Sequence, residues 1–172
     1  ATVQPPGSFR RRHRVVTRPA YIHDVGNVRA EAAVAQTILI VEDEGIIARD
    51  LQQQLLNLGY EPVDIAVSGE DALAMADAKR PQVVLMDIHL PNRSGIECAA
   101  LLRQQLPKLQ IIMLTVYDDS VTLFKALRAG ACGYLLKRAR PSEILEAIQE
   151  AQRGGAPMSS EIARQVVAAF QE

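Results

Sequence analysis

The chain has 172 residues, of which 48% are hydrophobic and 23% are charged, and its formal net charge is −1 at pH 7. This composition is ordinary for a globular protein, and the length allows one packed domain with additional segments. No apolar run approaches the roughly 18 residues of a membrane-spanning helix, and two cysteines do not make a disulfide framework.

Residues 1–36 carry six arginines against two acidic residues, which gives this segment a local charge of +4. The segment lacks sustained hydrophobic periodicity, so we expect a basic, flexible N-terminal arm. Binding of nucleic acid or of an anionic membrane surface by its arginines is the alternative. The remainder is mildly acidic and is no platform for nucleic acid. Its cysteines, Cys98 and Cys132, are expected to be the reduced thiols of a cytoplasmic protein.

From residue 37 onward, short apolar runs alternate with helical patterns. Strands are predicted at 38–42, 62–66, 83–87, 110–115 and 133–137. Three helices are predicted over about 45–58, 95–105 and 159–170. Three more are predicted to begin after an N-cap at Ser68, after Asp118 or Asp119, and at Pro141. The apolar stripe of the first helix is assigned to Ile46, Ile47, Leu51, Leu55 and Leu58. Five strands alternating with five of these helices predict an α/β fold with a doubly wound, five-stranded parallel sheet.

Four of the apolar runs end in residues with reactive or charged side chains. These residues are Glu42 and Asp43, Asp87, Thr115, and Lys137. Because the carboxyl ends of parallel strands lie along one edge of a sheet, we expect these side chains to converge in one crevice. Three carboxylates held close together repel one another unless a proton or a cation intervenes, and hard oxygen ligands suit Mg²⁺. Asp87 can then act as a nucleophile that forms an aspartyl phosphate, with Lys137 and Thr115 binding phosphoryl oxygens.

Four sequence motifs resemble the signature set of two-component response-regulator receiver domains. They are Val41-Glu42-Asp43, Leu85-Met86-Asp87-Ile88-His89-Leu90-Pro91, Leu114-Thr115 and Gly133-Tyr134-Leu135-Leu136-Lys137. The resemblance covers about residues 37–153 and implies a flavodoxin-like sheet with strand order 2-1-3-4-5. It implies that Asp87 is the phospho-acceptor and that Thr115 and Lys137 hold the phosphate. The implied Mg²⁺ ligands are Glu42, Asp43, Asp87 and the backbone carbonyl of His89.

The resemblance also implies how the chain signals. A sensor histidine kinase or a phosphotransfer protein supplies the phosphoryl group, and the domain catalyses at most its own phosphorylation and dephosphorylation. Thr115 and Tyr134 form the implied switch, which remodels the surface of the fourth helix, fifth strand and fifth helix. Arg138 departs from the family pattern, because many receivers have proline directly after the lysine. His89 and Tyr117 stand where family members tune the hydrolysis of the phosphoryl group.

Three stretches in the second half, at 114–119, 129–137 and 154–159, are similar to the NarL/FixJ branch of this family. Branch members are transcription regulators in which a linker helix and a four-helix DNA-binding domain follow the receiver. We therefore interpret residues 154–172 as a linker and C-terminal helix. The chain is expected to lack the DNA-binding domain and to bind no specific nucleic acid and no membrane. The last helix is interpreted as a linker or dimerising element, with packing on its own domain as the alternative.

Several functions remain open at this point. The receiver belongs either to a transcription regulator or to a single-domain relay. A rival class is a small phosphatase or phosphotransferase that works through an aspartyl phosphate. Such enzymes usually carry an Asp-x-Asp motif whose second aspartate is an acid–base group, and His89 occupies that position here. A flavin or nucleotide-binding module would need a glycine-rich loop after the first strand, which the sequence lacks.

Overall fold

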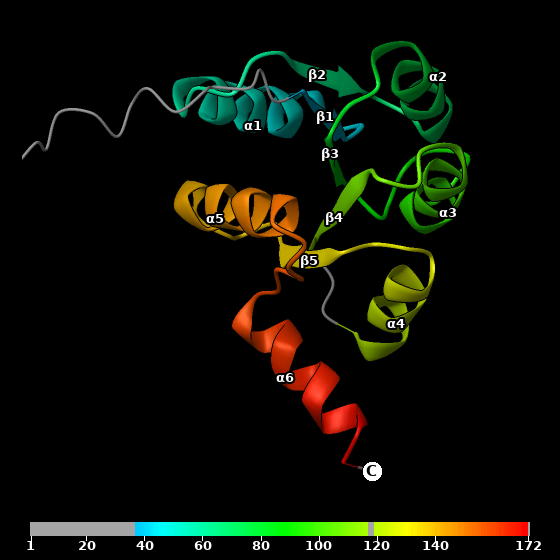
Figure 1. The fold of residues 1–172 in the computed structure, drawn as a ribbon, viewed down its shortest axis with the longest axis vertical. Helices are drawn as coiled ribbons and strands as arrows, with labels where there is room; N and C mark the ends of the chain where they lie inside the picture. The colour runs from blue at the N-terminus through cyan, green and yellow to red at the C-terminus, as the bar shows by residue number, and fades with distance from the viewer. Residues whose placement is uncertain (1–36, 117–118, 172) are drawn as a thin grey trace, which may run out of the picture. The chain divides into compact units, whose positions relative to one another are not determined.

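The computed structural model describes residues 37–116 and 119–171 (Figure 1). The strands are β1 (Ile38–Val41), β2 (Val63–Ala66), β3 (Val83–Met86), β4 (Gln110–Thr115) and β5 (Gly133–Leu136). The helices are α1 (Gly45–Asn57), α2 (Gly69–Lys79), α3 (Gly95–Gln105), α4 (Ser120–Arg128), α5 (Pro141–Gln152) and α6 (Ser160–Ala169). The predicted arm, residues 1–36, and Tyr117 lie outside the described residues.

The five strands form one parallel sheet with the order β2-β1-β3-β4-β5. This order confirms the predicted doubly wound fold. The register brings Val41 of β1 level with Met86 of β3, so these two central strands end side by side. The residues that follow them, Glu42 and Asp87, therefore emerge next to each other at the carboxyl edge of the sheet.

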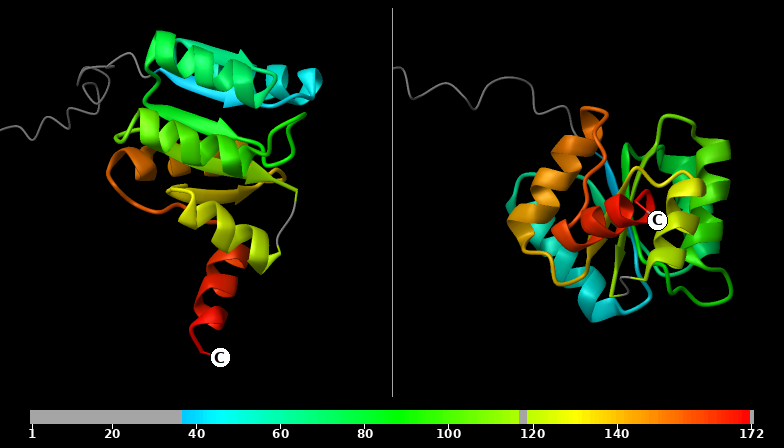
Figure 2. Two further views of the ribbon diagram at one scale, coloured as in Figure 1. Left: turned by 90° about the vertical axis from the view of Figure 1, so that its right-hand side faces the viewer. Right: turned by 90° about the horizontal axis from the view of Figure 1, so that it is seen from below.

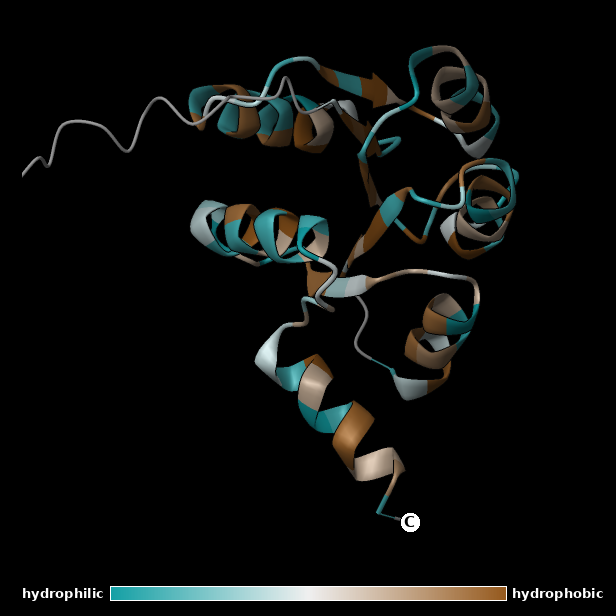
Figure 3. Cartoon of the chain, viewed as in Figure 1, coloured by the Kyte–Doolittle hydropathy of each residue, from teal (hydrophilic) through white to brown (hydrophobic). Residues whose placement is uncertain are grey.

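Helices cover both faces of the sheet. Figure 2 shows α1 and α5 on one face and α2, α3 and α4 on the other. Along β1, Leu39 and Val41 join the core beneath α2, α3 and α4, whereas Ile38 and Ile40 join the core beneath α1 and α5. Burial on both faces explains why β1 and β3 are continuous apolar runs, whereas the edge strand β2 includes the half-buried Asp64. In Figure 3, β3 is accordingly brown, whereas β2 carries a teal band.

The apolar stripe predicted for α1 is only partly correct. Leu51 and Leu55 are buried, and Ile47 is half-buried. Ile46 is 88% exposed and Leu58 is 42% exposed, so these two assignments were wrong. Ile46 precedes Leu51 by five positions, about 140° around the helix, which turns its side chain away from the sheet. Leu58 follows the last helical residue as the C-cap and has left the helical stripe.

Polar side chains fix where two of the helices begin. Ser68 caps α2 by accepting a hydrogen bond from the backbone N–H of Asp71 at 3.1 Å. Asp119 caps α4 by accepting one from the backbone N–H of Thr122 at 2.8 Å. Of the two residues predicted as possible caps of this helix, Asp118 and Asp119, the cap is therefore Asp119. Each cap satisfies a backbone N–H that has no partner within its helix.

The chain returns to the outer edge of β5 after α5. An isolated parallel bridge pairs Tyr134 with Met158, and α6 then lies beside α4 (Figure 1). The last helix thus packs on its own domain, at the end of the sheet formed by β5.

Candidate functional site

Three carboxylates gather at the carboxyl edge of β1 and β3. Glu42, Asp43 and Asp87 each offer one carboxylate oxygen, and these three oxygen atoms lie within 4.8 Å of one another. The sheet itself sets this spacing, since the backbone N–H of Asp87 donates to the carbonyl oxygen of Val41 at 2.9 Å. Glu42 is only 4% exposed and Asp87 only 6% exposed, whereas Asp43 faces solvent. The predicted acidic cluster therefore forms, with one side open.

Lys137 brings a positive charge into this cluster from the far side of β4. Its Nζ lies 2.5 Å from Oε2 of Glu42 and 2.9 Å from Oδ2 of Asp87. The residue follows β5 directly, and its backbone N–H donates to the carbonyl oxygen of Thr115 at 2.7 Å, which continues the pairing of β4 with β5. The lysine side chain thus spans the end of β4 to reach two carboxylates on neighbouring strands.

Burial and pairing set the protonation of this cluster. Burial raises the pKa of Glu42 above its ordinary value, and this outweighs the bonds that it accepts from Lys137 and from the backbone N–H of Glu44. Burial alone would lower the pKa of Lys137, but its bonds to Glu42 and Asp87 outweigh that effect and raise the pKa. The lysine is therefore held as an ammonium. Three carboxylates and one ammonium leave two formal negative charges, which a divalent cation would balance.

The loop after β3 orients the Asp87 carboxylate. The backbone N–H of His89 donates to Oδ1 of Asp87 at 3.3 Å, while Oδ2 faces Lys137. The loop closes where the backbone N–H of Gly95 donates to the carbonyl oxygen of Ile88 at 2.8 Å. A Cβ atom on Gly95 would lie 1.9 Å from the carbonyl oxygen of Asp87, so only glycine fits against this residue.

From the sequence, Gly95 was placed only at the start of the helix predicted at about 95–105, with no role at the site. Glycine permits a close approach of another backbone, but Gly45 also begins a helix and a Cβ there would meet nothing within 4 Å, so the sequence alone did not single out Gly95. The neighbouring cap, Ser94, accepts a hydrogen bond from the backbone N–H of Glu97 at 3.2 Å and fixes the start of the helix there. Gly95 therefore helps to define the conformation of the candidate nucleophile Asp87.

The remaining predicted residues lie around this cluster. Thr115 is the last residue of β4 and is fully buried. Tyr134, the second residue of β5, is also fully buried. The side chain of His89 is exposed, and its backbone N–H donates to Oδ1 of Asp87. Arg138, at the position where the family often has proline, pairs with Glu161 of α6 at 3.1 Å.

Hollows in the surface do not by themselves mark this site. One of about 540 Å³ lies next to it and is lined by residues that include His89, Asp119 and Lys125. A larger one, about 720 Å³, lies near the start of β3 and β4, where its lining includes Pro81 and Leu106. That edge is opposite to the carboxylates, so the chemistry of the side chains, and not the volume of the hollow, identifies the candidate site.

The fold and the acidic crevice define a class of protein. Residues 38–149 match the family of response regulator receiver domains. This chain belongs to that family, and it is a receiver domain of a two-component response regulator with an acidic pocket. It is therefore a signalling receiver and not a conventional enzyme, which argues against the rival interpretation as a small phosphatase.

Two relatives illustrate the similarity. The chain is 40% identical over 125 residues to the uncharacterized transcriptional regulatory protein YxjL of Bacillus subtilis, covering 67% of this chain and 57% of the relative. It is 34% identical over 130 residues to the response regulator UvrY of Escherichia coli O157:H7, covering 75% and 60% respectively. The chain thus matches about three fifths of the length of these relatives.

Solved structures show the same fold. A two-component response regulator of the LuxR family from Aurantimonas sp. SI85-9A1 is 30% identical with a TM-score of 0.75, covering 79% of this chain and 98% of that one. A CheY-like receiver domain protein from Methanospirillum hungatei JF-1 is 33% identical with a TM-score of 0.66, covering 69% and 94%. In the part of the chain that the structure describes, no helix combines the length and the apolar character that crossing a bilayer would require.

Proposed function

We propose that this chain is a phosphoryl-accepting switch, phosphorylated on Asp87 by a histidine kinase. The observation that carries the proposal is the position of Lys137, whose ammonium lies 2.9 Å from Asp87 within the group of three carboxylates. A receiver domain implies a cognate histidine kinase as partner. A carboxylate nucleophile beside a fixed cation and an acidic metal-type cluster offers the positioning and the charge neutralisation on which phosphoryl transfer depends.

Glu42, Asp43, Asp87 and the backbone carbonyl of His89 would hold Mg²⁺. The donor set fits this ion, because it offers hard oxygen ligands, an excess of negative charge and an open side at Asp43 for retained waters. When bound, Mg²⁺ supplies charge neutralisation for the carboxylates and for the transferring phosphoryl group.

The residues of the chain then divide the transfer between them. An oxygen of Asp87 attacks the phosphorus, and the bond from phosphorus to the kinase histidine breaks as the new phosphorus–oxygen bond forms. The backbone N–H of His89 keeps the carboxylate oriented through its bond to Oδ1. Lys137 exchanges its contacts with Glu42 and Asp87 for a phosphoryl oxygen, where it acts as a point charge. The hydroxyl of Thr115 donates to another phosphoryl oxygen.

The proposed switch continues from Thr115 to Tyr134. When the phosphoryl group draws Thr115 inward, the ring of Tyr134 takes up the space behind it, and the surface of α4, β5 and α5 changes. Both side chains are fully buried, so a shift of Thr115 has to be accommodated by the packing around it, which supports a coupled movement of Tyr134.

The proposed organisation assigns residues 1–36 to a basic arm, 37–153 to the receiver, and 154–172 to a linker with the C-terminal helix. The names of the relatives favour a role in transcription regulation over a single-domain relay. A cytoplasmic location and a homodimer belong to the same proposal, as does phosphorylation by a phosphotransfer protein in place of a kinase.

The test is labelling with a small phosphodonor. Incubation with acetyl phosphate and Mg²⁺, followed by intact-mass measurement, should add one labile phosphoryl group to the wild type and none to Asp87→Asn. Asp50→Asn, an exposed carboxylate on α1, is the matched control and should be labelled like the wild type. Equal labelling of Asp87→Asn and the wild type would reject the assignment.

A further inference from the structure

The loop between β3 and α3 contains a strained turn. The backbone N–H of Arg93 donates to the carbonyl oxygen of Pro91 at 2.8 Å, which closes a turn of three residues around Asn92. Asn92 has a φ of 65°, in the left-handed region, which asparagine tolerates better than most residues but which still costs free energy. A turn of this kind is rare, and it persists only where the surrounding contacts hold it. The same loop carries Asp87 and His89, which belong to the proposed Mg²⁺ site.

Arg93 anchors this loop to the start of α2. Its aliphatic stem lies over Gly69, the buried first residue of that helix, since a Cβ atom on Gly69 would lie 3.3 Å from Cδ of Arg93 and 3.4 Å from its Cβ. Its Nε lies 3.5 Å from Oε1 of Glu70. The side chains of this ion pair are 36% and 54% exposed, so the pair contributes little to stability. The stem that packs on the glycine therefore provides the firmer part of the anchor.

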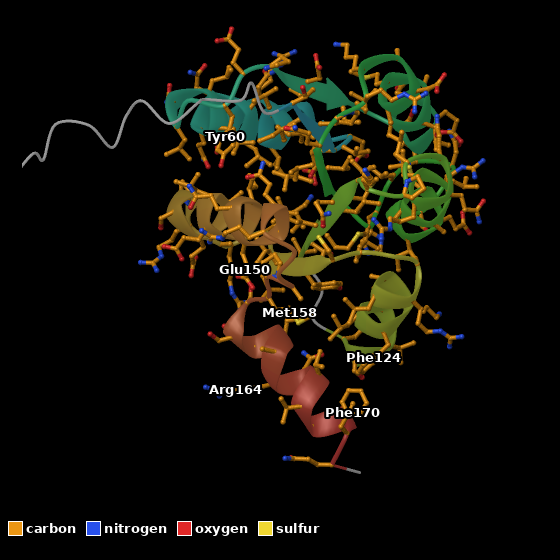
Figure 4. All side chains as sticks on the ribbon, in the orientation of Figure 1. Tyr60, Phe124, Glu150, Met158, Arg164 and Phe170 are labelled. Carbon is orange, nitrogen blue, oxygen red and sulfur yellow. The ribbon has the colours of Figure 1, made fainter. Side chains whose placement is uncertain are left out.

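Gly69 is also held from the side of α3. Sγ of the buried Cys98 donates to the carbonyl oxygen of Gly69 at 3.6 Å. Burial raises the pKa of the Cys98 thiol to about 11, so the thiol keeps the proton that it donates. Helices α2 and α3 lie side by side, as Figure 4 shows. The end of the loop and the first turn of α3 thus share one anchor point on α2.

The anchor connects two parts of the acidic cluster. The backbone N–H of Glu42 donates to the carbonyl oxygen of Ala66, the last residue of β2, at 3.0 Å. The chain enters α2 three residues later, at Gly69. Strand β1, which leads into Glu42, lies between β2 and β3 in the sheet. Arg93 therefore ties the loop that follows Asp87 to the segment that pairs with Glu42.

We infer that Arg93 is a positioning residue for the metal site, because its stem holds the loop after β3 in the conformation that binds Mg²⁺. This inference rests on the proposed function. The backbone N–H of His89 in this loop orients the carboxylate of Asp87, and the carbonyl of His89 is a proposed ligand. A loop released from α2 would relax at Asn92, and Mg²⁺ would then have to order it on binding. That ordering costs conformational entropy and lowers the affinity for the ion.

Calorimetric titration of the full-length chain with Mg²⁺ tests this role. Arg93→Ala removes the stem and should raise the dissociation constant for Mg²⁺ about tenfold, as do other substitutions just outside the ligands of a metal. Arg93→Met keeps most of the stem without the charge and should stay within about twofold of the wild type. Arg153→Ala, at the exposed C-cap of α5, is the matched control and should bind Mg²⁺ like the wild type. Equal affinities of Arg93→Ala and the wild type, or of Arg93→Ala and Arg93→Met, would overturn the inference.

Thermal melting in metal-free buffer separates positioning from a contribution to stability alone. A lower Tm of Arg93→Ala with an unchanged affinity for Mg²⁺ would also overturn the inference. Labelling of the wild type with acetyl phosphate separates the inference from the proposed function. A wild type that neither binds Mg²⁺ nor takes a label rejects the proposed function and the role of Arg93 with it. A labelled wild type whose affinity for Mg²⁺ is unaffected by Arg93→Ala rejects the role of Arg93 alone.

Discussion

The ammonium of Lys137 lies 2.9 Å from the carboxylate of Asp87, although β4 separates the strands from which the two residues emerge. At this edge of the sheet, a nucleophile, the carboxylate of Asp87, therefore lies beside a cation, the ammonium of Lys137. The cation can bind the group that the nucleophile attacks. Its Coulomb interaction is strengthened because Lys137 is 12% exposed and Asp87 is 7% exposed at the side chain.

Replacement of Lys137 by methionine should slow phosphorylation of Asp87. The variant keeps most of the unbranched side chain but removes the charge that stabilises the transferring group. The rate of labelling by acetyl phosphate should fall by about 100-fold, the usual effect of deleting one electrostatic contact to a transition state. Lys125→Met on α4 is the control and should label at the wild-type rate. A Lys137→Met protein with the same rate would show that the lysine serves the structure only.

Magnesium should stabilise the folded protein. Binding to the native state adds about 2.7 kcal/mol to the free energy of unfolding when Mg²⁺ is present at 100 times its dissociation constant. Asp43→Asn removes one of the three clustered carboxylates and should abolish most of this gain, measured as the shift of Tm upon addition of Mg²⁺. Asp50→Asn should keep the full shift. Equal shifts of Tm in Asp43→Asn and Asp50→Asn would show that Mg²⁺ binds elsewhere.

Gly95→Ala should both destabilise the protein and impair labelling of Asp87. The new Cβ would lie 1.9 Å from the carbonyl oxygen of Asp87, so the loop after β3 must move. We expect a loss of about 1–3 kcal/mol in urea unfolding, as for other overpacked sites. Gly45→Ala is the matched control, because Gly45 also begins a helix and its Cβ would meet nothing within 4 Å. Wild-type labelling and stability of Gly95→Ala would contradict the role given to this glycine.

Glu42 should make stability depend on pH in metal-free buffer. Its pKa in the folded protein is raised above the ordinary value of 4.5, chiefly by burial. A carboxyl group whose pKa is raised in the folded protein stabilises the fold fully at a pH below its pKa in the unfolded chain. This stabilisation is lost as the pH rises through the pKa of the folded protein. The free energy of unfolding of the wild type should therefore fall, relative to Glu42→Gln, as the pH rises from about 4.5 toward neutrality. Parallel stability curves for the two proteins would refute this expectation.

The sequence was most informative about the charged and reactive side chains that follow the ends of strands. Glu42, Asp87 and Lys137 each follow a continuous apolar run, and parallel pairing alone brings such ends to one edge. Their convergence was therefore predictable without knowledge of any side-chain conformation. The order of the strands came from the resemblance of the motifs, since alternating strands and helices are compatible with more than one order.

Other features depended on contacts that no local pattern encodes. Ile46 belongs to an apolar pair at the start of α1, and only the direction in which the helix faces the sheet reveals that it is exposed. Ser159 was recognised as a possible helix start, but its hydroxyl binds Leu136 of a distant strand. The importance of Gly95 comes from the approach of the Asp87 backbone. Each case is decided by tertiary packing between segments that are separate in the sequence.

The most direct test of the account is to locate the phosphoryl group chemically. Borohydride reduces an aspartyl phosphate to homoserine, which peptide mass spectrometry identifies at a single residue. After treatment of the wild type with acetyl phosphate and Mg²⁺, we expect homoserine at position 87 and only when Mg²⁺ is present. Homoserine at Asp43, or at position 87 in equal amount without the metal ion, would contradict the account.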